Sequence, residues 1–137
     1  MSRRPAAIAA LASVLLVLGP SSSDAHDVVT TTSLTRFKVP GGTTQRGTNV
    51  VLLGKLRSND LSCRDGLSVG LYRQDSTGDH LVARDVTDSE GEYVFQRRPR
   101  RDQTMIVRFA GLVQSSPDHS HDCGASASKE IRLRVSR

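Results

Sequence analysis

The chain has 137 residues, of which 36% are hydrophobic, 24% are charged and only 4% are aromatic, and its formal net charge is +5. This length predicts one compact domain and excludes a pair of catalytic domains, a dinucleotide-binding fold with a partner domain, and a protein with several membrane spans. The charge is below that of a dedicated nucleic-acid-binding domain, but an excess of this sign favours acidic polymers of the cell envelope.

Residues 1–25 have the pattern of a secretory signal peptide. Two arginines open the segment, an apolar run covers residues 6–18, and small residues at 23–25 precede the expected cut. The apolar run has 13 residues, which is too short to span a membrane. We therefore expect export by the general secretory route and a secreted product without stable membrane insertion. It would begin at His26 and carry a formal charge of +4, because cleavage removes two arginines and one aspartate.

Beyond residue 26, apolar and polar residues alternate with a period of two, which is typical of half-buried β-strands. Glycine, asparagine, aspartate, serine and proline separate these runs and predict turns. The runs lie at 50–57, 67–72, 81–86, 93–95, 105–109 and 131–135, with an opening strand near 31–39. Apolar residues in the run at 81–86 compete for both faces, which a β-bulge would reconcile.

Seven short strands of this kind predict an all-β fold, a single antiparallel seven-strand β-sandwich of Greek-key type. We expect an N-terminal segment with the first strand at 26–47 and the sandwich domain at 48–137. The number of strands indicates the fold class but not the order of the strands.

The two cysteines are expected in loops, Cys63 after the second strand and Cys123 after the sixth. With immunoglobulin-like connectivity, these loops emerge at the same end of a seven-strand sandwich. Exported proteins with two cysteines usually oxidise them, so we expect a Cys63–Cys123 disulfide. Closing a loop of this length would stabilise the fold by about 4 kcal/mol. A reactive thiol or a metal ligand is the alternative, and the lack of tryptophan excludes the antibody type of sandwich.

The segment 87–95, with the sequence TDSEGEYVF, resembles the T-D-x-x-G-x-[YF]-x-F hairpin of carboxypeptidase-regulatory-like and transthyretin-like modules. In such a hairpin Asp88 accepts hydrogen bonds from nearby backbone amides, Gly91 takes a positive φ, and Tyr93 and Phe95 point inward. Residues 107–111 and 128–131 resemble secreted bacterial immunoglobulin-like domains. The resemblance covers about residues 48–136 and implies an immunoglobulin-like sandwich without a particular activity, because such folds serve many roles.

Histidines and carboxylates gather beside Cys123 in a segment that we expect to be a loop. The candidate metal ligands are His119, His121 and Asp122. Imidazole nitrogen suits Zn²⁺ and Cu²⁺, and the disulfide would carry Asp60 and Asp65 to the same end. The amine and imidazole of His26 could also chelate copper after cleavage. The alternative is an ordinary solvated loop, since His-x-His matches no strong zinc pattern.

Four arginines surround Pro99 in the expected loop between the fifth and sixth strands. They are Arg97, Arg98, Arg100 and Arg101. Guanidinium groups pair with phosphate and carboxylate in a bidentate manner, which indicates an anionic glycan or wall polymer as the partner. The alternative is a charged turn that keeps one end of the sandwich soluble. Nucleic acid is not expected as a partner, because no aromatic residues for base stacking interleave with the arginines.

The sequence contains no recognisable catalytic arrangement. It has no G-x-S-x-G motif, and we expect all four histidines (26, 80, 119 and 121) at loop or terminal positions. We therefore predict a non-catalytic protein without a cofactor, with a structural role or an interaction with an unknown protein or cell-envelope polymer. The alternative is a small extracellular ligand-binding protein for a metal ion (Zn or Cu) or an anionic glycan.

Overall fold

A computed structural model describes residues 26–34, 43–115 and 119–137, with the side chains of 26–28 and 119 left outside the description. The expected signal peptide at 1–25 and most of the expected opening strand at 31–39 lie outside the described residues. Within the described ranges the fold is all-β, with twelve strands, one 3₁₀ turn and no α-helix. No helix there is long and apolar enough to cross a membrane.

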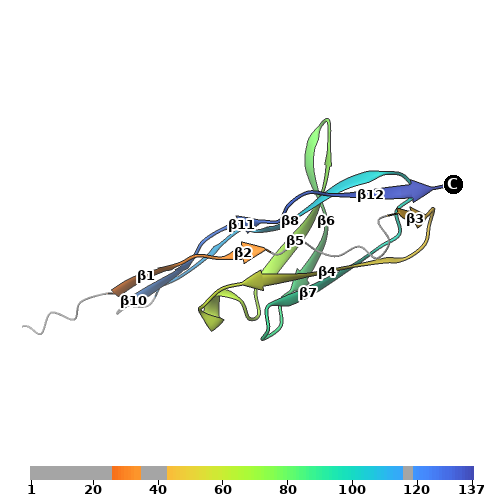
Figure 1. Cartoon of the computed structure of the whole chain (residues 1–137). Coiled ribbons are helices and arrows are strands. Elements are labelled where there is room, and N and C mark those ends of the chain that lie inside the picture. Colours follow the sequence, from red (N-terminus) through yellow and green to blue (C-terminus); the bar gives the residue numbers. More distant parts are fainter. Residues whose placement is uncertain (1–25, 35–42, 116–118) are drawn as a thin grey trace, which may run out of the picture.

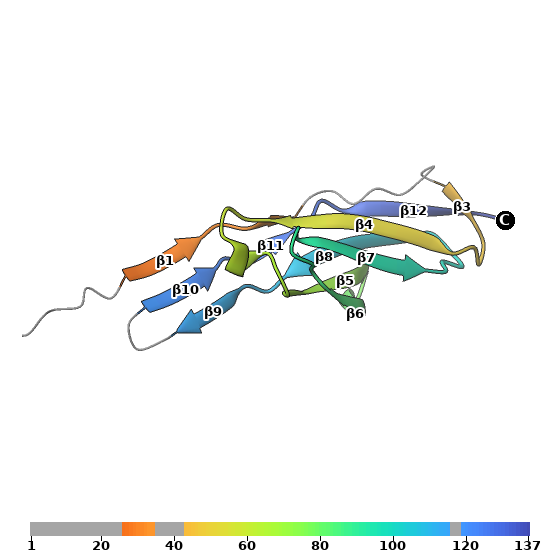
Figure 2. The ribbon, with the colours of Figure 1, turned by 90° about the horizontal axis from the view of Figure 1, so that it is seen from below.

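The strands form three sheets (Figures 1 and 2). One sheet contains β2 (Ser33–Leu34), β4 (Val50–Arg57) and β7 (Glu92–Arg97). The largest contains β3 (Thr43–Gln45), β12 (Ile131–Ser136), β8 (Gln103–Phe109), β5 (Ser68–Asp75) and β6 (Gly78–Val86), with β11 (Ser126–Ala127) paired to β8. The third contains β1 (His26–Thr30), β10 (His119–Cys123) and β9 (Leu112–Ser115).

One hydrophobic core lies between the first two sheets, which face each other as two layers (Figure 2). Alternate residues of β4, β7 and β12 enter this core, as the alternation in the sequence predicts. From one layer come Leu52, Leu56, Tyr93 and Phe95, and from the other Val69, Leu71, Met105, Val107, Phe109 and Leu133. An apolar core of this kind stabilises the fold by removing these side chains from water.

The number of strands differs from the seven expected, because segments outside the expected runs also form strands. The opening residues contribute β1, β2 and β3 to three different sheets, and β9, β10 and β11 intervene between β8 and β12. Gly111, with φ +86°, separates β8 from β9. The pairs are antiparallel as expected, except that β1 with β10 and β12 with β3 are parallel. In Figure 2 the ribbon of β1, β10 and β9 extends beyond the two-layered core.

The hairpin that carries the family resemblance has the expected local structure. The Oδ1 atom of Asp88 accepts hydrogen bonds from the backbone amides of Glu90 (2.9 Å) and Glu92 (2.8 Å). Gly91 has φ +80°, and a Cβ atom there would clash with the carbonyl oxygen of Leu56. The buried rings of Tyr93 and Phe95 lie 5.5 Å apart between their centroids.

The β-bulge expected near 81–86 is also confirmed. Leu71 pairs with Ala83 and Tyr72 pairs with Leu81, which leaves Val82 as the extra residue of β6. Because the bulge adds one residue to β6, it changes which face of the sheet each residue occupies from one side of Val82 to the other, and this accounts for the competing apolar positions in the sequence.

Candidate functional site

A disulfide joins the third sheet to the turn that follows β4. The sulfurs of Cys63 and Cys123 are 2.00 Å apart, in agreement with the expected pairing. Cys63 ends the 3₁₀ turn η1 (Leu61–Cys63), whereas Cys123 is the last residue of β10 and lies in a strand, where we had expected a loop. The bond therefore fixes the end of the β9–β10 ribbon to the layered core.

An acidic side chain next to this disulfide contacts a histidine of β10. The Oδ1 atom of Asp60 accepts hydrogen bonds from the amide of Ser62 (2.9 Å) and from its hydroxyl (2.8 Å). The other oxygen of Asp60 lies 3.3 Å from Nδ1 of His121. The bonds from Ser62, and to a lesser degree the contact with His121, lower the pKa of Asp60 below its ordinary value. Asp60 is therefore ionised at neutral pH. It lies next to β10, at the end of the molecule to which the disulfide was expected to bring it.

The candidate metal ligands lie in a strand and not in the loop that the sequence predicted. Because strand residues alternate between two faces, Asp122 belongs to the face opposite to His119 and His121. The described side chains contain no group of three histidine, cysteine or acidic residues that could hold a metal ion. Metal binding by His119, His121 and Asp122 stays a prediction, and Asp60 is the carboxylate that the structure brings to His121. Polar composition had suggested a loop, but neighbouring strands on both sides stabilise β10.

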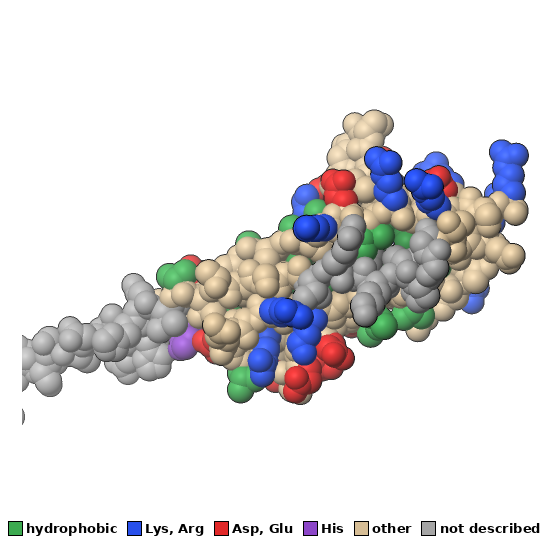
Figure 3. All heavy atoms as spheres, in the orientation of Figure 1, with side chains coloured by type: hydrophobic (Ala, Val, Ile, Leu, Met, Phe, Trp, Pro, Cys, Tyr) green, Lys and Arg blue, Asp and Glu red, His purple; other side chains and the backbone are tan. Residues whose placement is uncertain are grey.

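A basic cleft lies at the other end of the layered core, where β5, β8 and β12 come together. Its volume is about 570 Å³. The charged residues that line it are Arg73, Asp75, Arg101, Asp102, Arg132 and Arg134. The lining therefore contains four arginines and two aspartates. Figure 3 shows Lys and Arg side chains gathered on the surface along β12. An excess of guanidinium groups in a concave surface attracts anions.

The cleft arises because Asp102 fastens the loop after β7 to β12. Pairing between β8 and β12 extends to Gln103 and Leu133. Beyond this pair, Oδ1 of Asp102 accepts a hydrogen bond from the amide of Val135 at 2.8 Å. Arg132 and Arg134 alternate with the buried Leu133, so both stay exposed on the outer face of β12.

Three buried polar atoms of the cleft residues have no hydrogen-bond partner in the described part of the chain. They are Nε of Arg73 and the Oε1 atoms of Gln74 and Gln103. Buried polar groups without partners are rare in folded proteins, and they often mark a place where water or a ligand binds.

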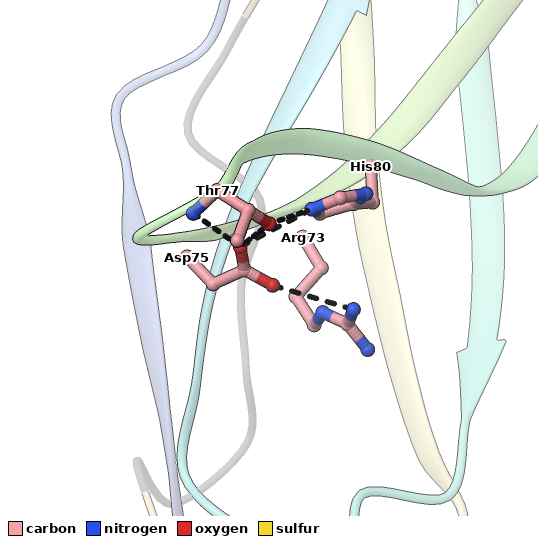
Figure 4. A network of polar contacts seen from close by, with 4 residues as sticks. All are labelled: Arg73, Asp75, Thr77 and His80. Atoms are coloured by element: carbon pink, nitrogen blue, oxygen red, sulfur yellow. Dashed lines mark hydrogen bonds and ion pairs between the residues drawn. The ribbon is translucent and has the colours of Figure 1, made fainter.

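The network beside the cleft keeps Arg73 in position (Figure 4). Asp75 Oδ1 accepts hydrogen bonds from the amide (2.9 Å) and the hydroxyl (2.6 Å) of Thr77, and it lies 3.1 Å from Nε2 of His80. Its other oxygen lies 3.4 Å from Nη2 of Arg73. The bonds from Thr77, and then His80, lower the pKa of Asp75, so this carboxylate stays charged and orients Arg73.

The expected positions of the histidines need correction. His80 lies in β6, and His119 and His121 lie in β10, so these three occupy strands and not loops. His26, which we expected at the terminus of the processed chain, lies in β1. The polar neighbours of all four resemble loop composition, but β1 and β6 are edge strands, which accept polar residues on their exposed faces, and β10 is held by strand pairing on both sides.

The arginines of the predicted patch are dispersed by the fold. Arg97 ends β7, is partly buried and donates from Nη1 to the carbonyl oxygen of Val82 at 3.4 Å. Arg98 and Arg100 lie on either side of the buried Pro99, and Arg101 alone of the four lines the cleft. Sequence reasoning missed Arg132 and Arg134, although their alternation with Leu133 could have placed them together on one exposed face.

A wider groove of about 760 Å³ lies on the outer face of the largest sheet, near β11. Its floor includes Gly70, and Arg84 and Arg108 line it. The guanidinium of Arg108 lies 5.4 Å from the ring centroid of Tyr72 and forms an ion pair with Asp79. Because Arg108 is already paired and the lining is mostly small and apolar, this groove is a weaker anion site than the basic cleft.

Comparison with known proteins shows likeness in structure only. No protein-family model matches the chain, and no curated protein matches its sequence. A variant of the superoxide reductase (neelaredoxin) from Ignicoccus hospitalis matches 75% of this chain over 82% of its own, with a TM-score of 0.51 and 8% identity.

Two further solved structures match more loosely. The sulfur carrier protein SoxY from Chlorobium limicola f thiosulfatophilum matches 80% of this chain over 84% of its own, with a TM-score of 0.44 and 11% identity. A conjugative transposon lipoprotein from Bacteroides eggerthii matches 74% of this chain over 95% of its own, with a TM-score of 0.39 and 13% identity. At 8% identity, the match to the superoxide reductase indicates similarity of fold and not of activity.

Proposed function

We propose that the protein is an exported, non-catalytic β-sandwich module that binds an acidic polymer of the cell envelope through the basic cleft. The observation that carries this proposal is the convergence of Arg73, Arg101, Arg132 and Arg134 on one concave surface. We also propose that the fold is of the immunoglobulin-like, carboxypeptidase-regulatory-like type, which the hairpin at Asp88 and Gly91 supports.

Export is supported by the disulfide. Cytosolic proteins rarely keep a disulfide between buried cysteines, because their compartment is reducing. Cys63 and Cys123 are both buried and joined, and the sequence before His26 has the pattern of a signal peptide. An envelope polymer is therefore a partner that the exported chain would meet.

The charges of the cleft suit a polymer with repeated acidic groups. Its two aspartates already have partners, because Asp102 binds the Val135 amide and Asp75 binds Thr77. Neither carboxylate needs an arginine of the cleft as its sole partner, so the guanidinium groups can pair with sulfate, phosphate or carboxylate groups. Such contacts are solvent-exposed, so binding should weaken as salt screens the charges.

The test measures binding of the chain from His26 onward to a heparin octasaccharide, which serves as an anionic glycan probe. We expect binding that weakens with added salt and that falls about tenfold in the double variant Arg132→Ala/Arg134→Ala, because each exposed ion pair contributes under about 1 kcal/mol.

The matched control is Arg57→Ala/Arg84→Ala, which also removes two positive charges but leaves the cleft lining intact. This control should retain nearly all of the affinity. Equal losses in the two double variants would show attraction by net charge alone and would refute the cleft. Absence of binding to the octasaccharide and to isolated wall polymer would leave the structural role as the better account.

A further inference from the structure

The wider groove on the outer face of the largest sheet has the dimensions of a small-molecule site. Pairing between β5 and β8 ends with Gly70 and Arg108, and the groove continues past this pair to Gly66 and Gly111. Its volume of about 760 Å³ is within the range of clefts that bind small molecules. Such clefts are mostly apolar and carry a few polar groups that orient the ligand.

Small side chains keep this groove open. Six of its fourteen lining residues are glycine or alanine, namely Gly66, Gly70, Ala110, Gly111, Ala125 and Ala127. Leu67, Phe109 and Leu112 add apolar surface. Ser68 and Tyr72 both line the groove and are four positions apart in β5, which is about 13 Å in a strand. An apolar hollow of at least this length accommodates an extended acyl chain better than a compact ring system.

Arg84 places a positive charge in this groove without a carboxylate to compensate it. Arg84 is exposed and takes part in none of the ion pairs among the described side chains. Within the described part of the chain, no acidic residue lines the groove. Asp85, the next residue, accepts a hydrogen bond from the amide of Val94 in β7 at 2.7 Å. The Arg84 guanidinium is therefore available to an acidic group of a ligand.

The second arginine of the groove is compensated and belongs to its wall. Gly70 is the register partner of Arg84 in β6 and of Arg108 in β8, so the two arginines flank it. Arg108 forms an ion pair with Asp79 and lies 5.4 Å from the ring centroid of Tyr72. An added Cβ atom at Gly70 would lie 2.8 Å from Cε2 of Tyr72, so the glycine allows this ring to lie against the sheet. One uncompensated charge beside apolar surface remains.

We propose that this groove binds a molecule with an acyl chain and a single terminal carboxylate. The carboxylate pairs with Arg84, because guanidinium groups bind carboxylates in a bidentate manner. The chain lies along the apolar lining toward Gly111 and Leu112, where each methylene removed from water adds to the affinity. This ligand differs from that of the basic cleft, which suits repeated acidic groups. Heparin has no apolar body, so the loss of Arg84 should leave heparin binding unchanged.

The first test follows amide chemical shifts of the chain from His26 onward while dodecanoate is added below its micellar concentration. We expect saturable shifts centred on residues 68–72, 108–112 and 125–127. Acetate has the carboxylate without the chain, and dodecyltrimethylammonium has the chain with the opposite charge, so each should bind at least tenfold more weakly. The proposal is overturned if dodecanoate gives no saturable shifts in the groove, or if either of the other two probes binds as tightly.

The second test uses two variants with matched controls. Arg84→Ala should weaken dodecanoate binding about fivefold, as expected for one exposed ion pair, whereas Arg57→Ala removes an exposed charge outside the groove and should have no effect. Ala127 is exposed on β11, so Ala127→Leu should fill the groove and weaken binding at least tenfold, while Ala127→Ser should not. Melting temperatures without ligand show that each variant is folded. Unchanged affinity in Arg84→Ala or Ala127→Leu, or an equal loss in its control, would overturn the site.

Discussion

At the scale of single residues, Tyr93 is a large side chain that is almost completely buried together with its polar hydroxyl group. It is the largest side chain that the structure buries almost completely, and its hydroxyl has no hydrogen-bond partner among the described residues. The ring fills the space above Gly54, where an added Cβ atom would clash with the hydroxyl oxygen. Burial raises the pKa of Tyr93 above its ordinary value, because the phenolate would lose its hydration.

This raised pKa predicts a loss of stability in alkali. The unfolded chain releases the proton of Tyr93 near pH 10.0, whereas the folded protein keeps it to higher pH, so rising pH favours the unfolded state. The free energy of unfolding should fall by up to about 1.4 kcal/mol for each pH unit above 10 through this group. Tyr93→Phe should remove that part of the slope in urea unfolding, while Tyr72→Phe should keep it. A Tyr93→Phe slope equal to the parent's would contradict the assignment.

Among the elements, the hairpin before β7 has the most specific local chemistry. Asp88 binds two backbone amides, and Gly91 lies against the backbone of Leu56, whose amide donates to the Gly91 carbonyl at 2.8 Å. Thr87 joins the same hairpin to the start of β5, since its hydroxyl accepts from the Leu67 amide at 2.9 Å. The hairpin thus connects the two layers of the core.

A comparison of two glycines tests this contact. Gly91→Ala should lower the free energy of unfolding by about 3 kcal/mol, because it combines a positive φ with a clash against the Leu56 carbonyl. Gly47 has a similar φ of +76° but open space around its Cβ position, so Gly47→Ala should lower it by about 1 kcal/mol. Equal losses in guanidinium unfolding would show that the contact with Leu56 is unimportant.

The elements that could be predicted from the sequence are those that have local signals. Alternation around Leu133, the turn at Asp88 and Gly91, and the competing faces near Val82 each act within a few residues. Strand β10 could not be predicted, because most of its residues are polar and its stability comes from strands on both sides.

The candidate sites depend more on which strands pair, and in which register, than on the local pattern of the sequence. Arg73 and Arg132 are far apart in sequence, and they meet because β5 and β12 both pair with β8. The pairing of His26 with His119 likewise follows from the parallel register of β1 and β10. Of the predicted arginine patch at 97–101, only Arg101 lines the cleft.

At the scale of the whole molecule, the described chain is a layered core with the proposed binding surface at one end and the ribbon of β1, β10 and β9 at the other. The basic cleft lies where β12 and β5 end, and the ribbon of β1, β10 and β9 extends from the opposite end beyond the disulfide (Figure 1).

Removal of the disulfide should affect both the global stability and the ribbon. Cys63→Ala/Cys123→Ala should lose about 4 kcal/mol in guanidinium unfolding, because the bond closes a loop of 60 residues. Amide hydrogen exchange should rise first in β10, which would lose its covalent link to η1. A loss below about 1 kcal/mol, or exchange that rises equally in every strand, would contradict this role.

The central claim, that acidic polymers bind in the basic cleft, is tested most directly by mapping amide chemical shifts while the heparin octasaccharide is added. The account predicts that the largest shifts occur in residues 73–75, 101–104 and 132–134, which line the cleft. They should be reversed by added salt. Shifts centred on the outer-face groove at Gly70 and Arg108, or spread evenly over all exposed arginines, would contradict it.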